Sequence, residues 1–207
     1  MKLVILGANG RTGTHVVQEA LAGGDMVTAI VRSEAKRPLV HHPQLKVAVG
    51  DPCNPTFLAE VFGGQDAVIS TLGGRSPTKK ATSIYWWSAN AIVEAAGVVG
   101  LGRVAVTSSA LLFPSTRFVD KLLVNLVSNV VQSAARMEET LLRANLDVIV
   151  GRCGFLTDQD EKRYRAELGA LPENGSSVSR LSVASFLLDK IRAPSSGKQI
   201  YGVARVC

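Results

Sequence analysis

The chain has 207 residues, of which 46% are hydrophobic and 19% are charged. This composition is typical of a globular protein with one sizeable core, and it excludes a disordered chain. The three cysteines form no close pair, so neither a disulfide framework nor a metal site is expected, and a cytoplasmic location is favoured. The net charge is +6, but the basic residues are scattered, and we expect no nucleic-acid partner. No apolar segment is long enough to span a bilayer, so no membrane partner is expected.

The N-terminal segment predicts a dinucleotide-binding turn. An apolar strand over residues 2–6 leads into Gly7, Gly10 and Gly13, and a helical pattern begins at once. Gly7 permits a tight turn, Gly10 lets the backbone approach phosphates, and Gly13 lets the helix pack against the strand. The helix N-terminus would then face a pyrophosphate. The spacing is G-x-x-G-x-x-G rather than G-x-G-x-x-G, and a glycine turn without a ligand is the alternative.

The end of the second predicted strand indicates which dinucleotide is bound. Residues 14–22 predict a helix and residues 25–31 a strand, and Arg32 and Ser33 follow directly. A site for NAD places Asp or Glu here, whereas a basic residue pairs with a 2′-phosphate. Because a planar guanidinium suits a phosphate, the sequence predicts NADP(H) in preference to NAD(H). A solvated loop cation is the alternative for Arg32.

Two further strand ends are predicted to face the cofactor. The third strand is predicted over 45–51 and ends in Gly50-Asp51, and Asp51 could meet the adenine amino group or simply serve as a turn residue or helix N-cap. A short helix over 57–62 follows. Residues 65–74 predict the fourth strand and a glycine-rich exit. Because the first and fourth strands flank the switch point of a doubly wound sheet, Leu72 and Gly73 should lie against the cofactor.

The fifth strand is predicted to end at the reactive region. A helix over 83–97 contains Trp86 and Trp87, one expected in the core and the other at a pocket or dimer contact. The strand at 103–107 follows. Ligands of such sheets bind beyond the carboxyl ends of the strands, so the residues expected to point there are Thr107, Ser108 and Ser109. Capping of the loop backbone is the alternative for these hydroxyls.

The C-terminal half completes one α/β domain. Residues 118–143 predict the longest helix, whose wide apolar face fits a buried core helix, a dimer interface or a pocket wall. A sixth strand with its exit is expected at 146–154, and residues 155–158 are expected to cover the substrate end. An irregular segment is expected at 159–177. A last helix is expected to be capped by Ser182 and to run to Ile191, and a final strand is expected at 198–204. Alternating strands and helices predict a single Rossmann-like domain over residues 1–207, with a doubly wound parallel sheet. The acceptor site is expected in the loops after strands four, five and six, about 73–83, 107–117 and 151–177.

The motifs together resemble a known family. They are Gly7-x-x-Gly10-x-x-Gly13, Val31-Arg32, Gly50-Asp51, the segments 65–68 and 107–109, the segment 151–158, and 179–184 before the last helix. In this order, along essentially the whole chain, they resemble the atypical short-chain dehydrogenase/reductases. The most similar branch contains biliverdin reductase B and the bacterial NADH-flavin-reductase-like proteins.

The resemblance implies roles for individual residues. Gly7, Gly10, Arg11, Thr12 and Gly13 match the pyrophosphate loop, and Asn9 lies within it. Arg32 matches the 2′-phosphate site, Asp51 the adenine site, and Leu72 and Gly73 the residues that line the cofactor. Ser109 matches the serine near the nicotinamide that is implicated in reduction, and we therefore predict it as the catalytic residue.

Two departures from the family pattern bear on the chemistry. The Tyr-x-x-x-Lys pair is absent, because Ala89, Leu168 and Arg205 stand four residues after the three tyrosines. Gly154 replaces a histidine found in the biliverdin reductase B group, and Cys153 replaces a proline. Reduction of an isolated ketone normally needs a general acid. A flavin, quinone or linear tetrapyrrole delocalises charge and can take its proton from solvent, so hydride transfer depends mainly on positioning.

Three functions are compatible with these features. The favoured one is an NADPH-dependent reductase of a flavin, quinone or similar flat acceptor, acting as a monomer or homodimer. The second is a non-catalytic NADP(H) sensor that contacts a protein, in the manner proposed for NmrA-like regulators. A nucleotide-sugar epimerase or dehydratase fits poorly, because the chain is short and lacks the tyrosine motif.

Overall fold

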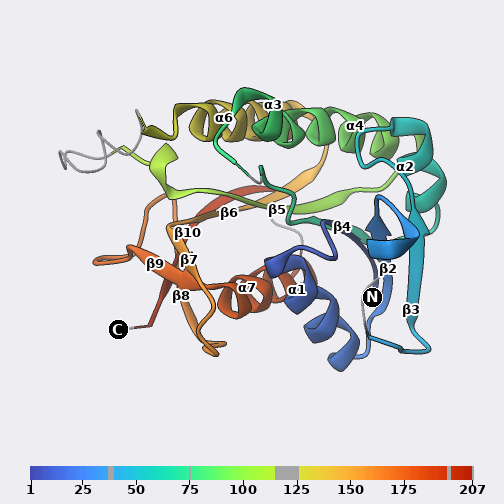
Figure 1. The fold of residues 1–207 in the computed structure, drawn as a ribbon, viewed down its shortest axis with the longest axis horizontal. Helices are drawn as coiled ribbons and strands as arrows, with labels where there is room; N and C mark the ends of the chain where they lie inside the picture. The colour runs from blue at the N-terminus through green and yellow to red at the C-terminus, as the bar shows by residue number, and fades with distance from the viewer. Residues whose placement is uncertain (37–39, 75, 115–125, 195–196, 207) are drawn as a thin grey trace.

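The protein is built on a mostly parallel sheet. The computed structural model describes residues 1–36, 40–74, 76–114, 126–194 and 197–206 (Figure 1). The strands of the main sheet are β1 (Lys2–Leu6), β2 (Met26–Val31), β3 (Leu45–Val49), β4 (Ala67–Ser70), β5 (Arg103–Ser109), β6 (Asp147–Cys153), β8 (Tyr164–Leu168) and β10 (Lys198–Arg205). Their order is β3-β2-β1-β4-β5-β6-β10-β8. The chain order reverses between β1 and β4, which is the switch point where open α/β sheets bind ligands.

Helices cover both faces of the sheet. On one face lie α1 (Arg11–Ala22) and α7 (Arg180–Arg192); on the other lie α2 (Pro55–Phe62), α3 (Lys79–Thr82), α4 (Ile84–Val99) and α6 (Ser128–Arg143) (Figure 1). Two short 3-10 turns, η1 (Glu34–Lys36) and η2 (Ala110–Leu112), follow β2 and β5. The predicted α/β Rossmann-like single domain is confirmed.

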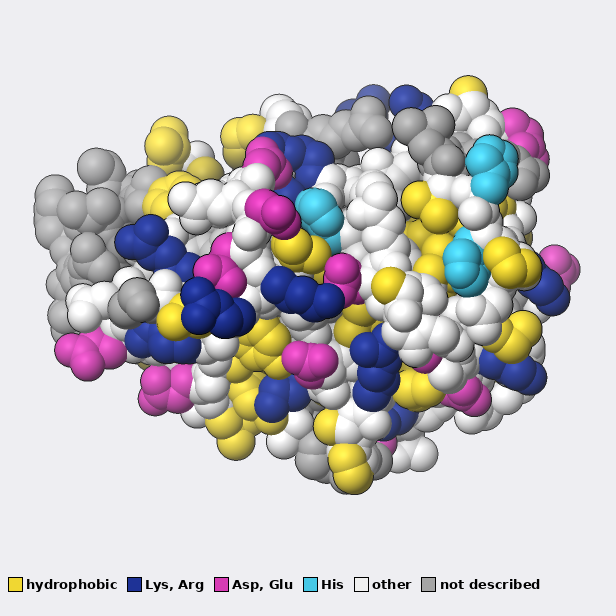
Figure 2. Space-filling view, turned by 90° about the horizontal axis from the view of Figure 1, so that it is seen from below, with side chains coloured by type: hydrophobic (Ala, Val, Ile, Leu, Met, Phe, Trp, Pro, Cys, Tyr) yellow, Lys and Arg dark blue, Asp and Glu magenta, His cyan; other side chains and the backbone are white. Residues whose placement is uncertain are grey.

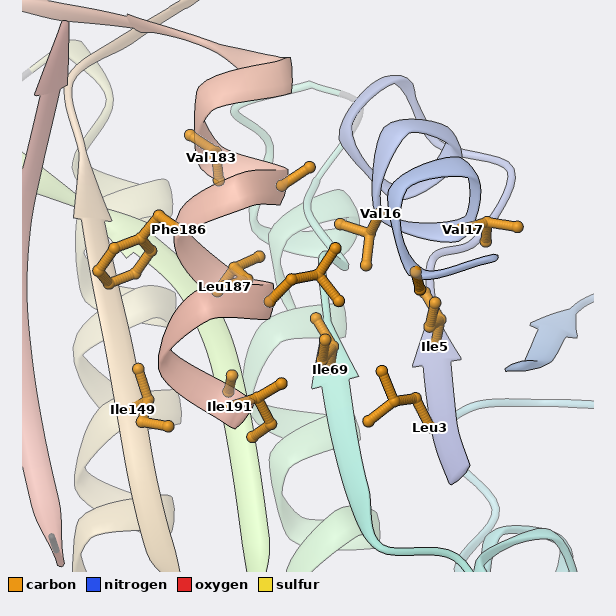
Figure 3. Close-up of a cluster of buried hydrophobic side chains, with 14 of the residues drawn as sticks. Leu3, Ile5, Val16, Val17, Ile69, Ile149, Val183, Phe186, Leu187 and Ile191 are labelled. Carbon is orange, nitrogen blue, oxygen red and sulfur yellow. The ribbon is translucent and has the colours of Figure 1, made fainter. Parts of the chain in front are cut away.

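The central strand β1 supplies both halves of the core. Leu3 and Ile5 pack beneath α1 and α7, beside Ile69 of β4 (Figure 3). Val4 and Leu6 point to the opposite face and join the cluster under α2, α4 and α6. Because the strand is buried on both sides, it reads as a continuous apolar run rather than an alternating one. The glycine loop that follows β1 is thereby anchored in the middle of the molecule.

Two details of the sheet and its edge differ from the expected ones. The sheet is not wholly parallel, because β8 runs antiparallel to β10. The segment 159–177, expected to be irregular, contains β8 and leads into β9 (Ser177–Ser179), which pairs with β7 (Phe155–Thr157) in a small parallel sheet. Both additions lie at the β6 side of the fold, near the predicted acceptor end.

Three helix boundaries differ from those expected. α1 begins at Arg11, directly after Gly10, rather than at residue 14. The N-cap of α7 is Ser179, whose Oγ accepts a hydrogen bond from the Ser182 N–H at 2.9 Å, so Ser182 is a buried residue inside the first turn. Of the long helix predicted over 118–143, the structure describes α6 from Ser128, and residues 118–125 lie outside the described residues.

The tryptophan pair lies at the surface of α4. Trp86 is half-buried and Trp87 is 51% exposed, and their rings stack with centroids 4.1 Å apart. The expectation that one tryptophan belongs to the core was therefore wrong. Each indole shields one face of the other, which reduces the apolar area that the pair presents to water.

The surface shows no segregation of charge on the face seen in Figure 2. Lys and Arg side chains there are interspersed with acidic and apolar ones. None of the helices in the described part of the chain combines the length and hydropathy that a membrane crossing requires.

Candidate functional site

A cavity of about 840 Å³ opens beyond the carboxyl ends of the parallel strands. Its walls come from the exits of β1, β2, β4 and β5 and from the starts of α1, α3, α4 and α7. The residues that line it are Gly7, Asn9, Gly10, Arg11, Thr12, Ile30, Val31, Arg32, Pro52, Thr71, Leu72, Gly73, Gly74, Thr78, Lys80, Ala81, Ile84, Tyr85, Thr107, Leu156 and Arg180. It crosses the switch point between β1 and β4, where a dinucleotide is expected.

The glycine loop fits a pyrophosphate. Gly7 has φ +79°, a conformation that glycine adopts without strain, and its carbonyl accepts the Gly10 N–H at 2.8 Å. A Cβ on Gly13 would lie 2.0 Å from the Gly7 carbonyl oxygen, so the helix packs directly on the loop. The N-cap Gly10 offers no side-chain cap to α1. The first amides of α1 therefore remain available for an anion at the cavity wall, as a bound dinucleotide pyrophosphate requires.

One end of the cavity lies at the exit of β2. Ile30 and Val31 form its wall, and Arg32 and Pro52 line it beside them. Arg32 is exposed, so its guanidinium can turn toward a ligand without losing a buried partner. This is the place that the sequence assigned to a 2′-phosphate.

The other end lies at the exits of β5 and β6. Thr107 of β5, Ile84 and Tyr85 of α4, and Leu156 of β7 line it. Leu156 is 37% exposed and its neighbour Phe155 is 65% exposed, so the rim at this end is apolar. An apolar rim beside a few hydroxyls suits a flat conjugated ligand.

The cavity is electropositive. Among the described residues that line it, four are cations, namely Arg11, Arg32, Lys80 and Arg180, and none is a carboxylate. Asp158 lies outside this set and pairs with both Arg11 and Arg180, the latter at 2.6 Å. Burial lowers the pKa of the Arg180 guanidinium. One carboxylate shared by two arginines leaves a positive excess that suits an anionic cofactor.

Nine of the predicted site residues line this cavity: Gly7, Asn9, Gly10, Arg11, Thr12, Arg32, Leu72, Gly73 and Thr107. The structure thus brings together residues from four separate strand ends. Their roles in binding stay predictions.

Five other predicted residues do not line the cavity. Gly13 packs against Gly7, and Ser33 belongs to the exposed turn after β2. The Asp51 carboxylate accepts the Cys53 N–H at 2.9 Å, and Ser109 Oγ accepts the Leu111 N–H at 3.3 Å. Both contacts are the turn and cap roles that the sequence left open. The fifth is Ser108, which faces a buried carboxylate.

That carboxylate, Glu138 of α6, joins three elements beneath the acceptor end. Ser108 Oγ donates to its Oε1 at 2.5 Å, and Arg152 Nη2 of β6 donates to its Oε2 at 2.7 Å. Arg152 also donates through Nη1 to the Leu112 carbonyl at 3.1 Å and lies 4.6 Å from the Phe113 ring centroid. The pair therefore fixes the η2 turn to the sheet, and with it the position of the segment that follows β5.

Tyr85 was not predicted as a site residue. Its hydroxyl lies over the exit of β4, 3.2 Å from where a Cβ on Gly73 would be. Burial raises the pKa of its phenol, the nearby Cys153 raises it further, and the Gly74 backbone N–H, which faces the phenol oxygen, opposes both. The phenol is therefore neutral around pH 7. No spacing in the sequence could have found it, because α4 and the β4 exit meet only in the fold.

Comparison with known families agrees with this site. Residues 7–194 match the family model described as NAD(P)H-binding. The chain belongs to this NAD(P)H-binding family. The predicted resemblance to atypical short-chain dehydrogenase/reductases is thereby confirmed at the level of fold and of NAD(P)H binding.

Solved structures with the same fold include several bacterial proteins. A short-chain dehydrogenase/reductase from Veillonella parvula DSM 2008, in complex with NADP, is 21% identical, covers 99% of this chain and 94% of its own, and has a TM-score of 0.82. The anaerobillin reductase ChuY from Escherichia coli O157:H7 is 22% identical, covers 99% of this chain and 97% of its own, and has a TM-score of 0.78. A Rossmann-fold NAD(P)-binding family protein from Shigella flexneri is 23% identical, covers 99% and 93%, and has a TM-score of 0.77.

Proposed function

We propose that this protein is an NADPH-dependent reductase of a flavin, quinone or similar flat conjugated acceptor. The observation that carries the proposal is the continuity of the cavity. It runs from Arg32 past the glycine loop to Thr107, and ends between Tyr85 and the apolar rim at Leu156. The three loops predicted for the acceptor, after β4, β5 and β6, each contribute a lining residue.

Bound NADPH supplies a hydride, and the chain's own residues hold the two reactants together. The α1 amides with Arg11 bind phosphate, and Leu72 and Gly73 support the cofactor's middle. Leu156 packs on the acceptor, which excludes water from one of its faces. The resemblance implies that Ser109, two residues after the lining Thr107 on β5, orients the acceptor; its Oγ now caps the η2 turn by accepting the Leu111 N–H, so this role requires the side chain to reach the cavity from the end of β5. Such positioning supplies most of the rate enhancement when the acceptor delocalises charge.

A panel of acceptors tests this function. Purified protein should oxidise NADPH with FMN or a soluble quinone, measured by the absorbance of NADPH. Ser109→Ala should lower that turnover by about tenfold, because one oriented hydrogen bond is lost. Tight NADPH binding without turnover across the panel would instead favour the non-catalytic sensor.

The proposed preference for NADP(H) depends on Arg32. Arg32→Gln should weaken NADPH binding by about 10- to 100-fold, since a charge-assisted hydrogen bond contributes about 1.5–3 kcal/mol. NADH, which lacks the 2′-phosphate, should bind to wild type and variant alike. Calorimetry with both cofactors measures the two affinities, and an unchanged ratio would refute the assignment.

A further inference from the structure

Tyr85 stands where the proposed reductase would need a proton. It lies at the start of α4 and lines the same end of the cavity as Thr107 and Leu156. At this end the acceptor would meet the hydride. A two-electron reduction of a quinone also consumes one proton, which must come from solvent or from a protein group.

The hydroxyl of Tyr85 has a hydrogen to give. The Gly74 backbone N–H faces its oxygen, and no group within the described ranges accepts its own hydrogen. Tyr85 lines the cavity, so this hydrogen is available to a ligand bound there. The phenol also stays protonated at neutral pH, because burial disfavours the phenolate.

Two other hydroxyls on the cavity wall are poorer donors. Thr71 Oγ1 already donates to the Leu6 carbonyl at 3.2 Å. Thr107 carries an aliphatic hydroxyl, which is far less acidic than a phenol. The remaining tyrosines do not line the cavity, and their hydroxyls have acceptors: Tyr164 Oη donates to Asp189 at 2.7 Å, and Tyr201 Oη donates to Gln199 at 3.0 Å.

We propose, resting on the reductase function above, that Tyr85 is the proton donor to the acceptor. With a quinone, the hydride delivers two electrons and one hydrogen, the O–H bond of Tyr85 breaks, and a new O–H bond forms on a quinone oxygen. Water then returns a proton to the Tyr85 phenolate. The net change converts NADPH, one proton and the quinone into NADP⁺ and the hydroquinone. This donor comes from α4 and needs no lysine four residues later.

The test compares Tyr85→Phe with wild type, and uses Tyr164→Phe as a matched loss of a tyrosine hydroxyl outside the cavity. Two acceptors are used: menadione, which needs a proton, and N-methylphenazinium, a cation that takes a hydride and needs none. Tyr85→Phe should lower kcat with menadione by about 10- to 100-fold and abolish its solvent deuterium isotope effect. With N-methylphenazinium the rate should change by less than about twofold, because no proton is transferred.

Binding provides a readout separate from turnover. Calorimetry should show the same NADPH affinity for Tyr85→Phe and wild type, and weaker binding of menadione to the NADP⁺ complex of the variant. Equal losses with both acceptors, or no loss with menadione, would overturn the role of Tyr85 and leave the reductase function standing. Absence of turnover by wild type with either acceptor would refute both.

Discussion

Glu138→Gln should lower the free energy of unfolding by about 3 kcal/mol, because it leaves the Arg152 guanidinium buried without a counter-charge. The Glu138 side chain is 4% exposed and that of Arg152 is 15% exposed, so water cannot replace the lost charge. The substitution keeps the shape of the side chain, and packing is therefore unchanged. Urea denaturation of both proteins measures the difference.

The next residue on α6 supplies the control. Glu139 also pairs with an arginine, Arg143, at 2.7 Å, but its side chain is 56% exposed. Glu139→Gln should cost no more than about 0.5 kcal/mol, because exposed ion pairs are screened by solvent. Similar losses of unfolding free energy for the two variants would mean that burial does not determine how much the Glu138–Arg152 pair stabilises the protein. Replacing both Glu138 and Arg152 by apolar residues should recover part of the loss, since no charge is then left unpaired.

This ion pair also illustrates what sequence reasoning could not supply. Glu138 and Arg152 lie 14 residues apart, and Ser108 is 30 residues before Glu138. Each taken alone reads as an ordinary polar residue. Only the meeting of α6, β5 and β6 makes them a buried network, and hydrophobic periodicity carries no information about that meeting. Ser108 was accordingly predicted to face the cofactor, whereas its hydroxyl donates to Glu138.

The strands that position the site were predicted well, for a physical reason. β1, β2 and β4 are buried between two layers of helices, so they read as short apolar runs followed by glycine or polar residues. β8 was not predicted although its sequence, Tyr164–Leu168, alternates apolar and polar residues, because it is a short edge strand that is never fully buried and ends exposed. Edge strands lack the burial that gives central strands their signal.

The residues of the candidate site likewise divide into those that the sequence could predict and those that it could not. The glycine loop and Arg32 follow β1 and β2 directly along the chain, so motif spacing was enough to find them. Tyr85 reaches the cavity from the start of α4, and Arg180 from the start of α7, directly after the short strand β9 that the sequence did not predict. Their side chains line it because of how α4 and α7 pack on the sheet, and spacing within the chain does not encode that packing.

Gly13→Ala should lower the free energy of unfolding by about 3 kcal/mol, at the upper end of the cost of overpacking. The added Cβ would lie 2.0 Å from the Gly7 oxygen and 2.7 Å from its carbonyl carbon. Both are backbone atoms of a turn whose φ is fixed at +79°, so neither can move away without opening the loop. α1 would have to shift, and its N-terminal amides would leave the cavity wall. NADPH binding should therefore weaken by at least about tenfold.

Gly97→Ala separates this steric effect from a general response to losing a glycine. Gly97 is an exposed residue of α4, and a Cβ there would meet no atom within 4 Å. The exchange should raise the free energy of unfolding by up to about 1 kcal/mol, because alanine favours the helix over glycine. NADPH affinity should not change, since α4 keeps its place. Urea denaturation should show a loss of stability for Gly13→Ala and a gain for Gly97→Ala. Calorimetry should show weaker NADPH binding for Gly13→Ala alone. A Gly13→Ala protein as stable as wild type, with full NADPH affinity, would show that the helix need not touch the loop for the site to form.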